Sequence, residues 1–140
     1  MSYLIDTNVL SELKKKDPSP LVKEWLLNKN SGTLFLSCLT IGEIRKGVER
    51  LPNSEKKQKL SDWLEVDLPQ FFTGRILPVD NEVADHWGHL MAKVNRPLPT
   101  IDSLLAATAQ AHRLTLVTRN TKDLSETGVD LFNPWEGSFD

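Results

Sequence analysis

Residues 100–117 have the sequence Thr100-Ile-Asp-Ser-Leu-Leu-Ala-Ala-Thr-Ala-Gln-Ala-His-Arg-Leu-Thr-Leu-Val117. The part from Leu104 to Ala109 is small and apolar on nearly every side of a helix, so we expect a helix over 101–112 that is packed on both sides. Thr115-Leu-Val117 follows after a short connection and is typical of a buried strand. A fully covered helix beside a buried strand indicates a sheet that lies between helical layers.

The rest of the chain repeats this alternation of strands and helices. Further strands are predicted at 3–5, 34–36, 76–79 and 130–132. Further helices are predicted at about 20–30, 40–50, 54–72 and 81–94. Such alternation is typical of a parallel sheet with helices on both faces. We therefore predict one α/β domain over residues 1–140, a three-layer α/β/α sandwich whose central, mostly parallel sheet has four to five strands.

The composition is that of an ordinary globular protein. The chain has 140 residues, of which 39% are apolar and 26% charged, enough for a core without disulfides. Cys38 lies in an apolar run, so we expect a buried, unreactive thiol. The apolar runs are far shorter than the roughly 20 residues of a membrane span, and Asp6 interrupts any signal-peptide pattern. We expect a cytoplasmic protein that does not contact a membrane.

The formal net charge of −2 hides an uneven distribution. Residues 44–60 hold six bases and two acids, and residues 91–122 hold five bases and one acid. Two basic stretches in a mildly acidic protein are compatible with a nucleic-acid-binding face. They are also compatible with solvated helix faces, which charge alone favours.

Four polar residues lie on connections that a parallel sheet would bring to one edge. Asp6 closes the first predicted strand and Asn120 follows the strand over 115–117, while Glu43 and Asp102 lie in the first turns of the helices that begin near 40 and 101. The carboxyl ends of parallel strands meet at one edge of a sheet, where ligands of such folds bind. Three converging carboxylates would repel one another and resist ionisation unless a cation joined them. Oxygen ligands suit Mg²⁺ or Mn²⁺ better than zinc. Together the four residues indicate a metal site.

Each of these residues also has a purely structural interpretation. Glu43 fits a capping box with Thr40 equally well. Asp102 would complement a helix dipole, and Asn120 is a common turn residue. Asp6 is the hardest to explain structurally, because an acid at the end of a buried strand has few structural uses.

A zinc site is a competing hypothesis. Glu82, His86 and His89 are spaced to lie on one helix face. The same stretch contains Asp85, so a solvated helix flank is the favoured interpretation.

Six segments, in this order and over nearly the whole chain, resemble those of the PIN-domain ribonucleases, especially VapC-type toxins and FitB-like proteins. They are Leu4-Ile-Asp-Thr-Asn-Val9, Leu39-Thr-Ile-Gly-Glu-Ile-Arg-Lys-Gly47, Gly74-Arg-Ile-Leu-Pro-Val79, Ile101-Asp-Ser-Leu-Leu-Ala-Ala-Thr-Ala109, Leu114-Thr-Leu-Val-Thr-Arg-Asn-Thr-Lys-Asp123 and Leu131-Phe-Asn-Pro-Trp135. The resemblance implies the same α/β/α sandwich and the toxin role in a type II toxin–antitoxin pair.

The resemblance also implies an acidic pocket for Mg²⁺ or Mn²⁺. It identifies Asp6, Glu43 and Asp102 as the metal ligands and catalytic acids, with Thr118 as a hydrogen-bond donor to them. The fourth catalytic position is often aspartate in the family, whereas this chain has Asn120, which lowers the charge of the site. The implied reaction is hydrolysis of RNA to a 5′-phosphate and a 3′-hydroxyl.

Basic residues near the acids are candidates for contacts with flanking RNA phosphates: Arg45, Lys46 and Arg119, with Arg50 and Arg96 beside them. The implied partners are an RNA substrate, a VapB-type antitoxin, operator DNA through that antitoxin, and a second copy in a homodimer. Aromatic residues that could form the dimer contact or belong to the core are Trp25, Trp63 and Phe71-Phe72.

Two other functions stay open. One is a non-catalytic PIN-like protein that acts only within an antitoxin–operator DNA complex, which Asn120 favours. The other is a receiver-like phosphotransfer domain. That class needs a second acid beside Asp6, where this chain has Thr7 and Asn8.

Overall fold

The computed structural model describes residues 1–139. The strands form one sheet in the order β3-β2-β1-β4-β5-β6. They are β1 (Tyr3–Ile5), β2 (Leu34–Ser37), β3 (Ile76–Leu77), β4 (Thr115–Val117), β5 (Leu131–Asn133) and β6 (Ser138–Phe139). Neighbouring strands from β3 to β5 pair in parallel, and β6 adds to β5 in the antiparallel direction.

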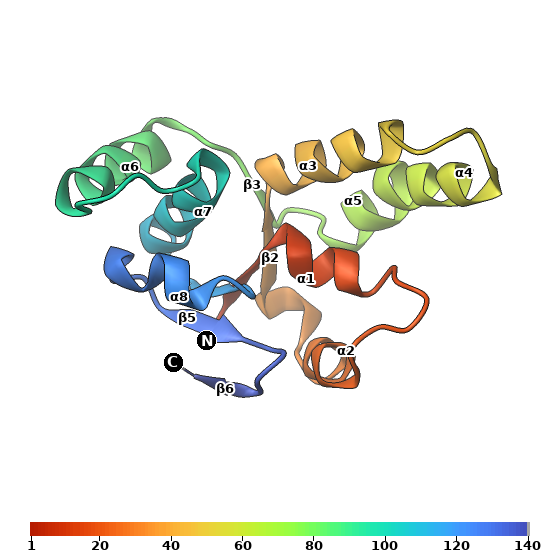
Figure 1. Ribbon diagram of the computed structural model, residues 1–140, viewed down its shortest axis with the longest axis horizontal. Helices are drawn as coiled ribbons and strands as arrows, with labels where there is room; N and C mark the ends of the chain where they lie inside the picture. The colour runs from red at the N-terminus through yellow and green to blue at the C-terminus, as the bar shows by residue number, and fades with distance from the viewer. Residues whose placement is uncertain (140) are drawn as a thin grey trace.

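The α-helices are α1 (Thr7–Glu12), α2 (Pro20–Leu27), α3 (Cys38–Glu49), α4 (Glu55–Asp62), α5 (Leu68–Phe71), α6 (Asn81–Lys93), α7 (Thr100–Ala111) and α8 (Thr121–Leu124). Short 3₁₀ turns lie at Ser31–Thr33 and Ser125–Thr127. Figure 1 shows the sheet between two groups of helices, with α1–α5 on one side and α6–α8 on the other.

Each face of the sheet has its own core because side chains alternate along the strands. Tyr3 and Ile5 pack into one core with residues of α1, α2, α3 and α5. Leu4 packs into the other with residues of α6, α7 and α8. The stretch of α7 from Leu105 to Ala109 is buried throughout, as its composition predicted. The predicted three-layer α/β/α class with a mostly parallel sheet is therefore confirmed.

The differences from the predicted elements are local. β3 ends at Leu77, because Pro78 cannot donate a ladder hydrogen bond, and it lies at the sheet edge. The predicted helix over 54–72 contains a π-helical turn, η2 (Trp63–Asp67), just before Pro69, which lacks an N–H. α1, α8 and β6 were not predicted. Within residues 1–139, no helix is both long and apolar enough to cross a bilayer.

Helix α3 begins earlier than predicted, and this corrects two interpretations. Its N-cap is Ser37, whose Oγ accepts a 3.0 Å hydrogen bond from the Leu39 N–H. Thr40 lies inside the helix and is buried, so Glu43 is not the partner of a Thr40 capping box. Cys38 is exposed instead of buried, because the strand ends at Ser37 and the thiol lies on the first helical turn.

The strand order places a topological switch point beside β1. From β1 the chain builds β2 and β3 on one side, then crosses to add β4 and β5 on the other. Ligand sites of open α/β sheets lie at the carboxyl ends of the strands at such a point. Receiver-like folds have the order 2-1-3-4-5, which differs from the order found here.

Candidate active site

Asp6 lies at the end of β1 and is 4% exposed. Its side chain serves as the N-cap of α1, and Oδ1 accepts a 2.6 Å hydrogen bond from the Thr7 N–H. Oδ2 accepts hydrogen bonds from Thr118 Oγ1 at 2.7 Å and from Asn8 Nδ2 at 3.2 Å. Strand β1 thus delivers a buried carboxylate whose orientation is fixed by three donors.

Thr118 follows β4, the strand that pairs with β1 on the far side of the switch point. It is fully buried, and its Oγ1 accepts a 3.1 Å hydrogen bond from the Asn120 N–H while donating to Asp6. The predicted supporting role of Thr118 therefore has a geometric basis. Its hydroxyl joins the ends of the two central strands.

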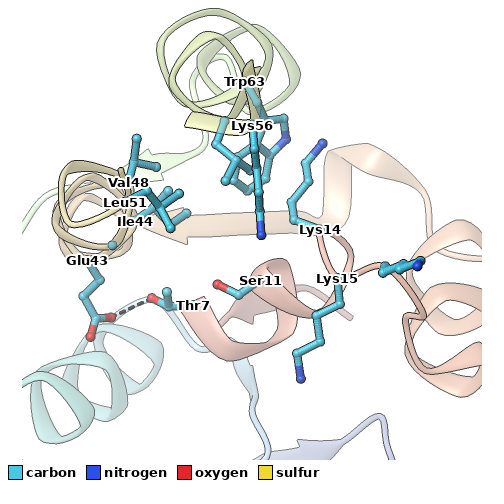
Figure 2. A pocket seen from close by; sticks show the side chains of 13 residues that line it. Thr7, Ser11, Lys14, Lys15, Glu43, Ile44, Val48, Leu51, Lys56 and Trp63 are labelled. Carbon is cyan, nitrogen blue, oxygen red and sulfur yellow. Dashed lines mark hydrogen bonds between the residues drawn. The ribbon is translucent and has the colours of Figure 1, made fainter. Parts of the chain in front are cut away.

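Glu43 is held by the hydroxyl group of Thr7, which in turn contacts a second hydroxyl group. It lies on α3, and its Oε1 accepts a 2.6 Å hydrogen bond from Thr7 Oγ1, as Figure 2 shows. Thr7 Oγ1 also lies 3.1 Å from the hydroxyl of buried Thr40, with which it hydrogen-bonds. The local sequence suggested Thr40 as a helix cap. In the structure it instead helps to orient Thr7, which orients Glu43.

Asp102 lies in the first turn of α7 and is partly buried. The Asn120 side chain hydrogen-bonds to it, which lowers the pKa of Asp102. Burial outweighs this effect and raises the pKa, helped by the charges of Glu43 and Asp123. Asp123 is exposed on α8, yet its charge reaches the same carboxylate.

The three predicted acids lie close enough to act on one another electrostatically. The pKa of Asp6 is raised to about 6, chiefly by burial and also by the charges of Asp102 and Glu43, while the hydrogen bonds from Thr118 and Thr7 lower it. The charge of Glu43 also raises the pKa of Asp102. The fold therefore brings together residues from positions 6, 43 and 102, at a cost that a bound cation would remove.

The donor set suits a hard divalent cation. It consists of carboxylate oxygens with the amide of Asn120 beside them. Asn8 Oδ1 is a buried acceptor without a hydrogen-bond partner and lies on the residue that donates to Asp6. Within residues 1–139, however, no three Asp, Glu, His or Cys side chains are already arranged to hold an ion.

The predicted RNA-contacting cations have different surroundings. Arg45 is paired with Glu49 at 3.2 Å and with Glu65 at 3.6 Å, so it connects helices. Arg119 lies over the ring of Trp135, 4.7 Å from its centre. Lys46 is exposed on α3.

Arg96, which the sequence analysis named beside these residues, also has partners within the chain. It is paired with Glu126 at 2.8 Å and donates to the Asp123 carbonyl.

The zinc hypothesis for α6 finds no support. His89 Nε2 lies 3.5 Å from Asp85 Oδ2 in an exposed pair. In the part of the chain that the structure describes, no metal-binding group of side chains forms there.

The aromatic candidates for a dimer contact are mostly core residues. Trp25 contacts Tyr3 and Phe132, and Phe72 is buried, whereas Phe71 is 50% exposed.

Sequence reasoning missed two residues of the site, Thr7 and Asn8. Their only signal was adjacency to Asp6, because hydrogen-bonding side chains next to a buried acid are well placed to orient it. Their actual partners depend on α1, a six-residue helix that no periodicity could reveal.

A family model of the PIN domain matches residues 3–129. The chain belongs to the PIN-domain family. This membership excludes the receiver-like alternative and confirms the family resemblance.

Relatives of this PIN-domain chain match it over nearly its whole length. It is 38% identical to Toxin FitB of Neisseria gonorrhoeae over 94% of this chain and 97% of the relative. It is 34% identical to VapC ribonuclease Y4jK of Sinorhizobium fredii over 95% of this chain and 97% of the relative. A solved structure of FitAB bound to an IR36 DNA fragment has a chain with a TM-score of 0.91 at 35% identity, covering 95% of both chains.

Proposed function

We propose that this PIN-domain protein is the toxin of a type II toxin–antitoxin pair and acts as a Mg²⁺- or Mn²⁺-dependent endoribonuclease. The observation that carries the proposal is the position of buried Asp6 at the switch point of the sheet, where Asp102 and Glu43 lie near enough for their charges to raise its pKa. The ribonuclease and toxin names of its relatives support the same activity. Because its substrate is cellular RNA, the proposed location is the cytoplasm.

Asp6, Asp102 and Glu43 would hold the cation, with Asn120 as a neutral neighbour. A divalent cation bound there would supply a nucleophilic water at neutral pH and neutralise the scissile phosphate. Thr118 and the Thr7 N–H fix both oxygens of Asp6, so the carboxylate needs little reorganisation when it binds. Glu43 is kept at the edge of the site by Thr7. In-line attack would leave a 5′-phosphate and a 3′-hydroxyl.

Purified protein incubated with RNA tests the proposal. Cleavage is expected with Mg²⁺ or Mn²⁺, with 5′-phosphate products, and is expected to stop on addition of a chelator. Asp6→Ala should abolish cleavage, and Asp85→Ala on the exposed face of α6 serves as the control. Equal cleavage by Asp6→Ala would remove the proposed site.

Asn120 supports a second function, a non-catalytic role within an antitoxin–operator DNA complex. Its amide donates to Asp102 and adds no charge, so the site has one carboxylate fewer than is common in the family. Under this alternative, the complex would bind operator DNA while the free protein left RNA intact with either metal. Turnover by the free protein decides between the two functions.

The proposed protein partners follow from the same role. A FitAB complex with DNA is among the similar structures, which supports a VapB-type antitoxin that also connects this protein to operator DNA. Co-expression with the product of a neighbouring small gene should yield a complex that shifts promoter DNA, while the toxin alone should not.

A homodimer is the remaining partner proposal. An apolar pocket of about 340 Å³ between α1, α2 and α5 has Leu27 and Phe71 at its rim, exposed by 74% and 50%. We propose that a second copy covers these residues. Phe71→Glu should convert the dimer to a monomer in light scattering, whereas an unchanged mass would rule out this contact.

A further inference from the structure

A groove of about 420 Å³ begins at Glu43 and runs between α1, α3 and the α4–η2 segment. Each segment contributes side chains spaced by four and three residues, which is the spacing of one helix face, although Lys14 and Leu51 lie just past the ends of α1 and α3. They are Thr7, Ser11 and Lys14; Ile44, Val48 and Leu51; and Lys56, Leu60 and Trp63, with Glu43 at the end nearest the acids. Figure 2 shows Glu43 and Thr7 at one end and Lys14 at the other.

The groove has an apolar wall and a cationic opening. Ile44, Val48 and Trp63 form part of the wall. Lys14 Nζ lies 4.7 Å from the centre of the Trp63 ring, and Lys56 extends from α4 into the space above Ser11 (Figure 2). Neither lysine has an ion-pair partner among the residues that the structure describes. Their charges are therefore available to a ligand.

We infer that this groove binds the single-stranded segment of RNA next to the cleaved bond, an inference that rests on the proposed nuclease function. Along α1 and the turn after it, Thr7 and Lys14 are roughly 10 Å apart at 1.5 Å per residue, so the cationic end lies near the acids. Lysines pair with backbone phosphates, and an aromatic side chain, which Trp63 supplies in this wall, stacks against bases. In duplex RNA the bases are already stacked, so the apolar wall favours an unpaired strand.

Gly47 keeps the groove open. It lies inside α3 and lines the groove, and a Cβ added at this position would meet no atom within 4 Å. Glycine is a poor helix former, so Gly47 does not stabilise α3. A larger side chain would extend into the space proposed for the RNA.

The charge of the groove is tested in the inactive Asp102→Asn background with a fluorescent ten-nucleotide single-stranded RNA. The double variant Lys14→Gln/Lys56→Gln should raise the Kd for this RNA about tenfold at low salt. A plot of log K against log salt concentration should become less steep by about 0.7 for each lysine removed. Lys93→Gln and Lys122→Gln, outside the groove, should leave both quantities unchanged. A duplex of the same sequence should bind more weakly than the single strand.

The shape of the groove is tested with one matched pair. Gly47→Leu and Gly88→Leu each replace an exposed helical glycine that has open space around it. Both should fold at least as stably as wild type, because leucine is the better helix former. Only Gly47→Leu should weaken RNA binding and raise KM with kcat unchanged.

The outcomes separate this inference from the proposed function. If the wild type never cleaves RNA, the nuclease proposal fails, and RNA binding by the groove is still measured directly. If the wild type cleaves RNA but the lysine and Gly47 variants match it in Kd and KM, the groove inference is wrong. Loss of antitoxin binding by these variants, with RNA binding intact, would identify the groove as a protein-binding site and also overturn the inference.

Discussion

Thr118 Oγ1 donates a 2.7 Å hydrogen bond to Asp6 Oδ2 across 112 positions of sequence. The bond joins the ends of β4 and β1. Burial raises the pKa of the Asp6 carboxyl group, and this hydrogen bond lowers it. Thr118→Val should raise that pKa further and weaken Mn²⁺ binding at pH 7 by about 10–100-fold in calorimetry. Thr118→Ser, which keeps the hydroxyl, should bind nearly as wild type. An unchanged affinity in the valine variant would contradict this role.

Binding of a divalent cation should depend on pH through Asp6. Protons compete with the cation for the ionised carboxylate, and the pKa of Asp6 without a cation is raised to about 6. The Mn²⁺ affinity should therefore be nearly constant above pH 7 and should fall about tenfold for each pH unit well below 6. Calorimetry from pH 5 to 8 measures this dependence. An affinity that does not change over this range would show that Asp6 is not a ligand.

Asp6 should destabilise the metal-free fold at neutral pH. Its pKa rises from an ordinary 3.8 to about 6, so the folded state holds the proton more tightly, and the unfolding free energy falls as pH rises through that window. This pKa difference corresponds to about 3 kcal/mol of lost unfolding free energy at pH 7.5. Replacing Asp6 by Asn removes this cost but also loses a hydrogen bond that contributes about 1 kcal/mol.

Thermal unfolding of Asp6→Asn in chelator measures this cost. The variant should have a higher Tm than wild type at pH 7.5, with a gain of about 2 kcal/mol that disappears near pH 4. Adding Mn²⁺ should stabilise the wild type more than the variant. A variant that is less stable than wild type at both pH values would contradict the raised pKa.

Replacing Asn120 tests how the neutral amide affects the site. Asn120→Asp removes the donor to Asp102 and adds a charge beside it, so the metal-free Tm should fall and Mn²⁺ should bind more tightly. Asp123→Asn is the matched change at an exposed acid and should alter affinity by less than about threefold, because solvent screens its charge. Stronger Mn²⁺ binding after the Asp123 change than after the Asn120 change would reverse this assignment.

The layered fold was predictable because its signals are local. The composition of residues 104–109 predicted a helix that is covered on both sides, and the two apolar runs at 3–5 and 115–117 end directly before Asp6 and Thr118. The short elements α1, α8 and β6 gave no such signal, since two to six residues show no period. Cys38 was misassigned because an apolar run does not reveal where a strand ends and a helix begins.

The acids of the candidate site were predictable, but most of their partners were not. Asp6, Glu43 and Asp102 follow from the rule that polar residues gather at the carboxyl ends of parallel strands. The bond from Thr7 to Glu43 depends on how α1 and α3 pack, which sequence spacing does not give. Arg45 looked available for RNA, yet its contact with Glu65 arises only from the packing of α3 against the following helix.

Cleavage of a tRNA pool by wild type and Asp102→Asn, each with Mn²⁺ and with a chelator, tests the central claim most directly. The account predicts cleavage by the wild type with Mn²⁺ and none in the other three reactions, with both proteins showing the same cooperative unfolding. Equal cleavage by Asp102→Asn, or cleavage that persists in the chelator, would contradict a cation site built from these acids.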